Sequence, residues 1–530
     1  MLLAVLGTGV FLAGLELMIT SVALPAILAD LASWTELRRA SWIVSGYLLV
    51  SVVAMPLAGR LADRFGVRRC FLAALTIFVV GSLVSGSAAS LDGLILGRAI
   101  QAAGGGALVP IATAAVAHLD VGPTRARSLG VIGALTFLGM AIGPFAGAAI
   151  LELAAPGGSL GSSSPLAPVL APAWRWVFYV NVPLGVAALA LGWAASAGWE
   201  VERDRAPLDL RGALLFSGAL AAGLVAITLA DDRSVGRLLD PGSPTTLLGA
   251  AAIGLGLAWA VVARRTDRPF LDPRLLRDRH LGSAVLVALL TGYGFATAIV
   301  GAAVFVDRVL YGGPATQRVV LGALAGATAA GALVAGPLLG RLSPRRLTLA
   351  GVALATGAMF AMGGWERETA ILPAAATLAV FGLGFGATVT ARSTAALDAV
   401  SRDAYGTAGA AVTVARMLGM AVGLAVLTAW GSTTIERLSA DVFATPEAYR
   451  AYIPVDLADR PLRDPLVVDA LEAWAAREAA GVMARIFALA AVVSALALLP
   501  ARLLPSGPVA DRPAADESPL VDGAILRVDG

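Results

Sequence analysis

Long apolar stretches separated by short polar segments dominate the hydrophobic pattern of the chain. A helix needs about 20 apolar residues to cross the hydrocarbon core of a bilayer. Read at this length, the pattern predicts fourteen membrane-spanning helices. Their approximate ranges are 1–24, 41–61, 70–90, 93–117, 126–151, 175–197, 209–229, 245–264, 282–306, 317–340, 346–363, 371–391, 407–432 and 481–503.

Composition agrees with an all-α integral membrane protein. Hydrophobic residues make up 58% of the 530 residues and charged residues only 14%, and the mean hydropathy is +0.82. Soluble domains carry about 25% charged residues. The net charge of +3 is too small to suggest a nucleic-acid partner, and the single cysteine, Cys70, excludes an intrachain disulfide. Because the first span lacks a basic leader and is too long for a signal peptide, we expect it to be retained.

Arginine placement predicts the orientation of the spans. All 39 basic residues are arginine, and they gather in loops after even-numbered spans, above all in "GRLADRFGVRR" (59–69) and "ARRTDRPFLDPRLLRDRH" (263–280). Loops rich in Lys and Arg stay on the cytoplasmic side of a membrane. We therefore expect a multi-pass protein of the inner (cytoplasmic) cell membrane with both termini in the cytoplasm.

The chain also repeats part of itself. Residues 54–75 have a degraded partner in residues 334–354, and each copy lies between the second and third spans of a six-span set. Duplicated halves that move about a central site are typical of transporters. The predicted domains are a first six-helix bundle (1–200), two linker helices with cytoplasmic loops (201–280), a second bundle (281–505) and a disordered cytoplasmic tail (506–530).

Two segments predict structure outside the membrane. The pattern of the thirteenth span continues past Trp430, and the last span begins early, so that a helix from Leu466 to Leu499 would be about 51 Å long against a core of about 30 Å. We expect an external extension over 431–480; a bulky loop with one short helix is the alternative. The Gly-, Ser- and Pro-rich segment 153–173 is typical of a flexible external loop.

Few ionisable residues fall inside the predicted spans, which makes each one a candidate for function. A charge at mid-membrane costs about 2.5–3.5 kcal/mol on insertion scales, so it needs a partner, water or a role. For Arg98 the alternative is a structural ion pair or a side chain that reaches the outer surface. For Asp307 and Arg308 it is exposure at the outer end of the ninth span. The candidates are Glu16, Arg98, Asp307, Arg308 and Arg416.

Four motifs in order give the chain a family resemblance. They are "GRLADRFGVRR" (59–69), "LILGRAIQAAGGGALVP" (94–110), "GMAIGPFAG" (139–147) and "WRWVFYVNVPLG" (174–185). With them, nearly the whole chain resembles the major facilitator superfamily, in its fourteen-helix drug/proton antiporter branch. The resemblance implies two six-helix bundles with two extra linker helices, alternating access and proton coupling.

The first motif is the expected gating loop. A carboxylate among arginines can bridge to a neighbouring helix end or arginine and hold one of two states, whereas arginines alone would serve as a membrane anchor. The third motif is the expected antiporter motif, whose glycines recur every four residues and let two helices approach closely; ordinary packing is the alternative. The gating residues are Gly59, Asp63, Arg64, Gly66, Arg68 and Arg69, and the antiporter residues are Gly139, Gly143, Pro144 and Gly147.

The resemblance also bears on proton coupling. The family links the arginine that Arg98 matches to proton transfer, and "ELMITSVALPAI" matches a family stretch that has aspartate at the position of Glu16. A buried carboxylate readily gains a proton, so we predict proton coupling at Glu16, Arg98, Arg416 and Asp307, with the Glu16 carboxylate reaching into the central cavity. The two histidines lie far apart, and we expect no metal, no cofactor and no enzyme activity.

A closer resemblance concerns the substrate. Residues 302–313 and 406–431 are similar to those of mycobacterial triacylglyceride exporters. Those exporters carry a fifth-helix glutamate where this chain has Phe137, so Arg416 needs another partner, either Glu16 or water in the cavity. The predicted function is proton-coupled export of hydrophobic or lipidic substrates.

Two alternatives to this function remain open, namely a broad multidrug/proton efflux pump and a non-transporting lipid-binding membrane protein. No phosphate-binding GxxxxGKS/T loop appears in the sequence, so the proton gradient is the expected energy source. The expected partners are protons, the lipid bilayer and a hydrophobic small molecule or lipid. We expect a monomer, with a periplasmic lipid-accepting protein as a candidate partner.

Overall fold

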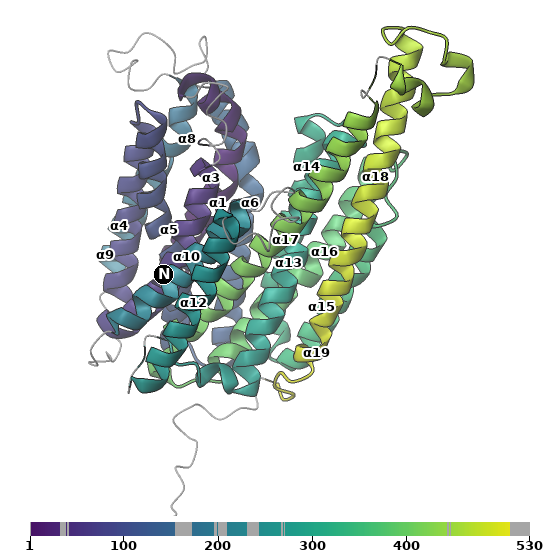
Figure 1. Ribbon diagram of the computed structural model, residues 1–530. Coiled ribbons are helices and arrows are strands. Elements are labelled where there is room, and N and C mark those ends of the chain that lie inside the picture. The colour runs from purple at the N-terminus through teal and green to yellow at the C-terminus, as the bar shows by residue number, and fades with distance from the viewer. Residues whose placement is uncertain are drawn as a thin grey trace, which may run out of the picture.

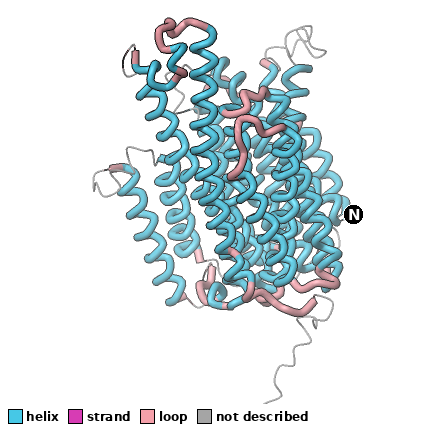
Figure 2. The backbone as a smooth tube through the Cα atoms, turned by 90° about the vertical axis from the view of Figure 1, so that its right-hand side faces the viewer, coloured by secondary structure: helices cyan, strands magenta, loops and turns pink. Residues whose placement is uncertain are grey.

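The computed structural model describes residues 2–31, 42–153, 172–195, 209–229, 243–266, 271–442 and 447–508, together with residues 39, 199, 269 and 445. All regular secondary structure in these residues is helical (Figure 2). Thirteen of the described helical segments are long and apolar enough to cross a membrane. One further helix, α15 (Pro344–Met362), packs alongside them, so the arrangement is consistent with the fourteen spans that the sequence predicts.

The helices form two bundles and a linker pair (Figure 1). The N-terminal bundle contains α1 (Leu2–Leu31), α3 (Trp42–Phe65), α4 (Val67–Gly86), α5 (Leu91–Leu119), α6 (Gly122–Leu153), η2 (Ala173–Arg175), α8 (Trp176–Tyr179) and α9 (Asn181–Ala195). The linker elements are α10 (Leu210–Leu229), α12 (Pro244–Arg265) and η3 (Leu275–Arg277). The C-terminal bundle contains α13 (Arg279–Arg308), α14 (Pro314–Leu338), α15, α16 (Ile371–Leu397), η4 (Arg402–Ala404), α17 (Tyr405–Val442), η5 (Ala448–Tyr452), η6 (Val455–Leu457), α18 (Pro465–Leu496) and α19 (Leu498–Ala501).

Helix contacts within and between the two bundles position the candidate functional site. In the N-terminal bundle α1 packs on α6, and α5 packs on α3 and α4. In the other bundle α13 packs on α17, and α14 and α15 pack on α16. The bundles meet where α6 contacts α14 and where α3 contacts α17. Helix α12 packs mainly on α10 and leaves nearly all of its apolar side chains at least partly exposed, as expected of a helix that faces lipid.

Short polar caps define where several helices begin. The Ser90 hydroxyl accepts a hydrogen bond from the Gly93 amide at 3.2 Å and starts α5, and Ser343 does the same for α15 through the Arg346 amide at 3.2 Å. The Asp278 carboxylate accepts from the amides of His280 and Leu281 at 2.8 and 3.0 Å at the start of α13. These side chains satisfy amide groups that would otherwise lack partners at each helix start.

The two helices that the sequence predicts to be long are long, whereas the external location of the extension over 431–480 stays a prediction. Helix α17 runs for 38 residues and α18 for 32, against 34 expected for the last helix. Their outer ends project beyond the neighbouring helices, at the upper right of Figure 1. The extension has a small core of its own, made of Val442, Tyr449, Ile453 and Val467.

A capped helix start closes this extension. The Asp464 carboxylate accepts a hydrogen bond from the Leu466 amide at 3.0 Å and pairs with Arg460 at 3.0 Å. The Leu466 amide, followed by Arg460, holds the pKa of Asp464 below its usual range. The start of α18 is therefore fixed by a charged cap.

Several predictions fall on residues that the structure does not describe. Residues 154–171 of the predicted external loop and 509–530 of the predicted tail lie outside the described residues. The boundaries near residues 200 and 280 stay a prediction, as does the cytoplasmic location of the termini.

The Arg345 amide donates to the Pro505 carbonyl at 3.2 Å, which places the turn before α15 and the end of α19 at the same end of the molecule. This end is called the inner end below.

Candidate functional site

Glu16 lies in α1 with none of its surface exposed, inside the N-terminal bundle. Its carboxylate pairs with the Arg98 guanidinium and accepts hydrogen bonds from the Thr20 hydroxyl at 2.8 Å and the Asn181 amide at 2.5 Å. These groups come from α1, α5 and α9. One carboxylate thus joins three helices of the same bundle.

Arg98 extends this network within the N-terminal bundle. Its guanidinium donates to the Gln101 side chain at 2.7 Å and to the Ile43 carbonyl at 3.3 Å, and it lies 4.0 Å from the centre of the Tyr47 ring. Gln101 in turn donates to Ser82 at 2.8 Å. We call Glu16, Thr20, Arg98, Gln101 and Asn181 the coupling cluster.

The structure corrects two expectations about Glu16. The carboxylate does not reach the central cavity, since Glu16 is not among the residues that line it, and its cation is Arg98 rather than Arg416. The reason is the direction of α1, whose Glu16 face is turned toward α5 and α9 inside the bundle. Of the two alternatives for Arg98, an ion pair is present, and the side chain is only 2% exposed.

Asn181 was missed from the sequence although it lies inside the quoted motif "WRWVFYVNVPLG". It is fully buried at the start of α9 and holds the second oxygen of the Glu16 carboxylate. The signal that could have found it is a lone amide between apolar residues, because a buried amide needs hydrogen-bond partners.

The antiporter motif packs directly against the segment of α1 that carries Glu16. A Cβ atom added at Gly139 would lie 2.2 Å from the Phe11 carbonyl oxygen, and one at Gly143 would lie 2.8 Å from the Met18 Cβ. At Gly147 it would lie 3.1 Å from the Ile19 oxygen. Close backbone contact between α1 and α6 therefore depends on these glycines, as the spacing predicts.

Replacing Gly139 by Ala is expected to push α1 away from α6. Overpacking of this kind costs typically about 1–3 kcal/mol, so we expect a lower melting temperature and reduced transport. The matched control is Gly249→Ala in α12, where an added Cβ meets nothing within 4 Å. Thermal unfolding of both purified variants checks the prediction, and equal melting temperatures would contradict it.

Asp63 links the two bundles at the inner end. Its carboxylate accepts hydrogen bonds from the amides of Gly406 and Thr407 at 2.9 and 3.1 Å and from the Thr407 hydroxyl at 3.2 Å. Gly406 and Thr407 form the start of α17, so of the two expected partners the structure shows the helix end. A carboxylate is favoured there by the free amides and the helix dipole. His118 lies 4.0 Å from the same carboxylate.

The other gating-loop residues lie around this contact. A Cβ at Gly59 would lie 2.4 Å from the Gly406 oxygen, so α3 and α17 touch by backbone. Gly66 has φ 89°, a conformation that favours glycine, in the turn between α3 and α4. Arg68 donates to the Trp193 carbonyl at 3.5 Å, Arg64 lies 5.3 Å from the Phe65 ring, and Arg69 is exposed.

A second inter-bundle contact at the inner end was missed from the sequence. Arg125 of α6 pairs with Asp398 at the end of α16 and donates to the Tyr405 hydroxyl at 3.2 Å. Arg125 lies near the start of its helix, where an arginine at the membrane–water interface is common, so its position in the sequence does not distinguish it. We call Asp63, Arg125, Asp398 and Tyr405, with the start of α17, the inner gate.

Removing both carboxylates of the inner gate is expected to open the inner end. The double variant Asp63→Ala/Asp398→Ala loses hydrogen bonds to charged groups worth about 1.5–3 kcal/mol each, enough to shift a two-state equilibrium at least tenfold. Spin labels at Val121 and Arg341, exposed inner-end positions of the two bundles, would report it as longer distances in a Cys70→Ser background. An unchanged distance distribution would contradict the gating role.

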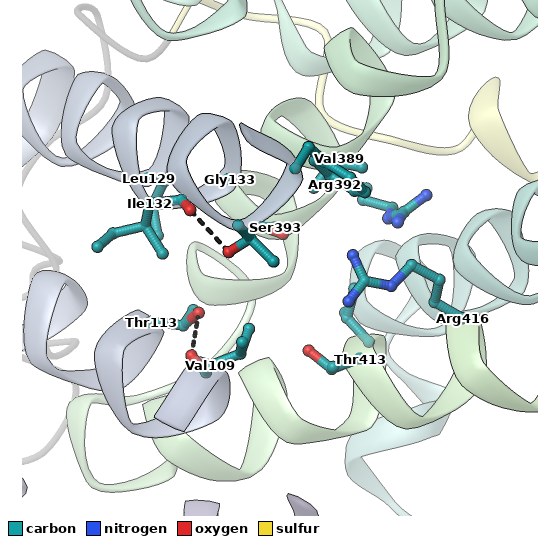
Figure 3. A pocket seen from close by; sticks show the side chains of 13 residues that line it. Val109, Thr113, Leu129, Ile132, Gly133, Val389, Arg392, Ser393, Thr413 and Arg416 are labelled. Carbon is teal, nitrogen blue, oxygen red and sulfur yellow. Dashed lines mark hydrogen bonds between the residues drawn. The ribbon is translucent and has the colours of Figure 1, made fainter. Parts of the chain in front are cut away.

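A cavity of about 40 Å³ lies between the two bundles (Figure 3). Its lining comes from α5 and α6 on one side and from α16 and α17 on the other, so both bundles contribute to it. The lining residues are Val109, Thr113, Leu129, Ile132, Gly133, Thr136, Phe137, Val389, Arg392, Ser393, Val412, Thr413 and Arg416.

Two buried arginines face this cavity. Arg416 is 8% exposed and lies 5.8 Å from the ring of Phe137, the residue that stands where the resemblance expects glutamate. Arg392 is 1% exposed and donates to the Thr291 hydroxyl at 2.7 Å. Arg392 was missed because the predicted span ended at residue 391, whereas α16 continues to Leu397.

Asp307 lies apart from these groups. Its side chain is 54% exposed near the end of α13, and it pairs with the neighbouring Arg308 at 3.1 Å. This is the surface placement that the sequence left open as the alternative. The exposed Asp307 lies outside the coupling cluster and is not among the residues that line the cavity between the bundles.

The geometry offers chemistry of three kinds: a buried carboxylate–guanidinium pair, a gate between two bundles and a positively charged cavity between them. Within the described residues, no group of three or more His, Cys, Asp or Glu side chains could hold a metal ion. A cavity between two bundles, with contacts that join the bundles at one end, is the arrangement expected of a transporter.

Comparisons with known proteins point the same way. Residues 6–424 match the model of the Major Facilitator Superfamily. A triacylglyceride transporter of Mycolicibacterium hassiacum is 32% identical over 438 residues, which cover 80% of this chain and 78% of that protein. A multidrug resistance protein B homolog of Mycobacterium tuberculosis is 29% identical over 432 residues, covering 78% of this chain and 73% of that protein. Among solved structures, a human organic anion transporter superposes with a TM-score of 0.59 at 16% identity, covering 94% of this chain and 98% of the other.

Proposed function

This chain belongs to the major facilitator superfamily of transporters, and we propose that it is a proton-coupled exporter of hydrophobic or lipidic substrates. The observation that carries the proposal is the buried Glu16–Arg98 pair. Glu16 belongs to α1, the helix that packs against the glycines of α6. An ion pair buried in a membrane bundle is a costly arrangement, and titratable groups in such places commonly serve proton pathways.

The proposed cycle uses the three sites in turn. With the inner gate open, the cavity between the bundles receives substrate from the cytoplasm or the inner leaflet. Closure of the gate through Asp63 and Arg125 commits the substrate to the outer side. A proton from outside then neutralises Glu16 and releases Arg98, and the rearranged cluster moves α1 against α6 to reset the bundles.

Relatives support a lipid as the cargo. The relative from Mycolicibacterium hassiacum is named a triacylglyceride transporter, and the extension formed by α17 and α18 gives a lipid tail a protein surface beyond the bilayer. The name of the multidrug resistance homolog supports the second candidate, a broad multidrug efflux pump. A lipid-binding protein without transport is the third and would have no use for the inner gate.

The proposal includes a location and partners. We place the protein in the inner (cytoplasmic) membrane with the inner gate and both termini on the cytoplasmic side. The reason is that arginine-rich loops, such as residues 59–69, stay on the cytoplasmic side of a membrane. It acts as a monomer on protons and substrate, and a periplasmic lipid-accepting protein would receive cargo at the extension.

A reconstituted transport assay separates the candidates. Purified protein in proteoliposomes is given a fluorescent triacylglyceride or a cationic dye, and movement of each is followed with and without an acidic exterior. Transfer of triacylglyceride supports lipid export, and movement of the dye alone supports the multidrug pump. If neither moves, export of triacylglyceride and efflux of cationic drugs are both wrong.

A further inference from the structure

The central cavity carries positive charge that no carboxylate of the described residues pairs with. Arg392 and Arg416 are 1% and 8% exposed, and the residues that line the cavity include no acidic side chain. Figure 3 shows both guanidinium groups on the same side of the cavity, one from α16 and one from α17. Arginine keeps its charge in proteins, so both groups stay cationic.

Both guanidinium groups also have unused hydrogen-bond donors. The Nε atoms of Arg392 and Arg416 are buried without a hydrogen-bond partner. Arg392 uses one nitrogen on Thr291, and the described contact of Arg416 is the ring of Phe137. A guanidinium offers five N–H donors, so most of them remain available to a bound molecule.

The other buried arginine of the described residues, Arg98, is neutralised by Glu16, and the partly buried Arg125 pairs with Asp398. Arg392 and Arg416 have no such ion pair among the described residues, and a charge buried in a membrane bundle without a counter-charge is costly. An anionic ligand would remove that cost for both arginines at once.

An aromatic wall adjoins the charges. Phe137 lies 5.6 Å from Phe295 and 5.8 Å from Phe385 between ring centres, and the latter two stack at 4.2 Å. Arg392 lies 5.5 Å from the Phe385 ring. Of these three rings Phe137 lines the cavity, and Phe295 and Phe385 are buried behind it. The site therefore combines a place for a charged group with one aromatic side chain beside it. At about 40 Å³ the cavity suits a small head group and excludes whole acyl chains in this arrangement.

We propose that this cavity binds the anionic head group, a carboxylate or a phosphate, of an amphipathic substrate. Arg392 and Arg416 hold the oxygens of the head group, and Phe137 contacts the first part of the apolar tail. The substrate assignment rests on the proposed function, which it narrows to amphipathic anions. A cationic amphiphile is repelled by the same two charges.

Binding to the full-length protein in phosphatidylcholine nanodiscs tests the site. The probe is dansyl-aminoundecanoic acid, and its uncharged methyl ester is the matched ligand. Arg392→Met and Arg416→Met are expected to weaken binding of the acid about 10- to 100-fold, the loss of a hydrogen bond between charged groups, and to leave the ester unchanged. Arg367→Met, at an exposed arginine outside the cavity, should bind the acid like the wild type.

Competition identifies the head group. Displacement of the probe by laurate or by dodecyl phosphate supports the site, and the stronger competitor identifies its preferred anion. If a methionine variant fails to fold, the corresponding lysine variant keeps the charge but loses the planar fork, and it should bind the acid about 3- to 10-fold more weakly.

Two results would overturn the proposal: equal binding of the acid and its ester by the wild type, or wild-type affinity for the acid in the arginine variants. The outcome is separable from that of the transport assay, because binding needs no proton gradient. Failed transport of the anionic probe itself in proteoliposomes, with intact anion binding, would overturn the export function alone.

Discussion

Replacing Glu16 by Gln is expected to abolish proton-driven transport while the protein stays folded. Glutamine keeps the size of the side chain and one of the two oxygens, which accept from Thr20 and from Asn181 respectively, but it can neither bind nor release a proton. An acidic exterior should then drive no more substrate export than it drives in protein-free liposomes. Exchange of substrate without a gradient should persist, because it needs only the movement of the bundles.

The control for this prediction is Asp307→Asn. Asp307 is exposed and paired with its neighbour, so its loss should leave proton-driven transport within about twofold of the wild type. Proton-driven export that survives in Glu16→Gln would place the coupling group elsewhere. Equal loss in both variants would mean that carboxylate removal impairs the protein without specificity.

Removing Arg98 is expected to have the largest effect on stability. Arg98→Met leaves the Glu16 carboxylate buried in the bundle without its cation, and breaking a buried pair in this way costs about 3–5 kcal/mol. The loss should appear as a clear fall in the melting temperature of the purified protein. Arg98→Lys should also be impaired, because one ammonium cannot reach Glu16, Gln101 and the Ile43 carbonyl together.

A double variant separates the structural part of this effect from the functional part. Glu16→Gln/Arg98→Met has no unpaired carboxylate and should recover much of the lost stability without recovering proton-driven transport. If the double variant is no more stable than Arg98→Met, the two residues are not coupled as the structure indicates. If it transports with the proton gradient, the cluster is not the coupling site.

Residue patterns were enough to predict the scaffold. The thickness of the bilayer sets the length of each span, and arginine-rich loops tend to stay on the cytoplasmic side. Both rules apply to each segment by itself, so the pattern of fourteen spans could be found without tertiary information. The long α17 and α18 were predictable for the same reason, since their helical pattern simply continues beyond the length of a span. Glu16 stood out because a carboxylate in an apolar run needs an explanation.

Partners were harder to predict because they depend on which way a helix face is turned. Glu16 was expected to reach the cavity, with Arg416 as one of its candidate neighbours, but the rotation of α1 directs it to Arg98 and Asn181. Arg392 was overlooked because a span predicted from hydropathy stops where a charged residue lowers the mean. In the structure Arg392 contacts Thr291 and Phe385, and α16 continues past it. Asp398 and Arg125 are 273 residues apart, and no local pattern reports such a pair.

The dependence of export on a proton gradient tests the central claim most directly. Wild-type protein is reconstituted with the substrate that it transports, and export is measured with an acidic exterior, without a gradient, and with an acidic exterior plus a protonophore. The account predicts accumulation of substrate outside against its own gradient only in the first condition, together with acidification of the liposome interior. Equal export in all three conditions, with no change of interior pH, would contradict it.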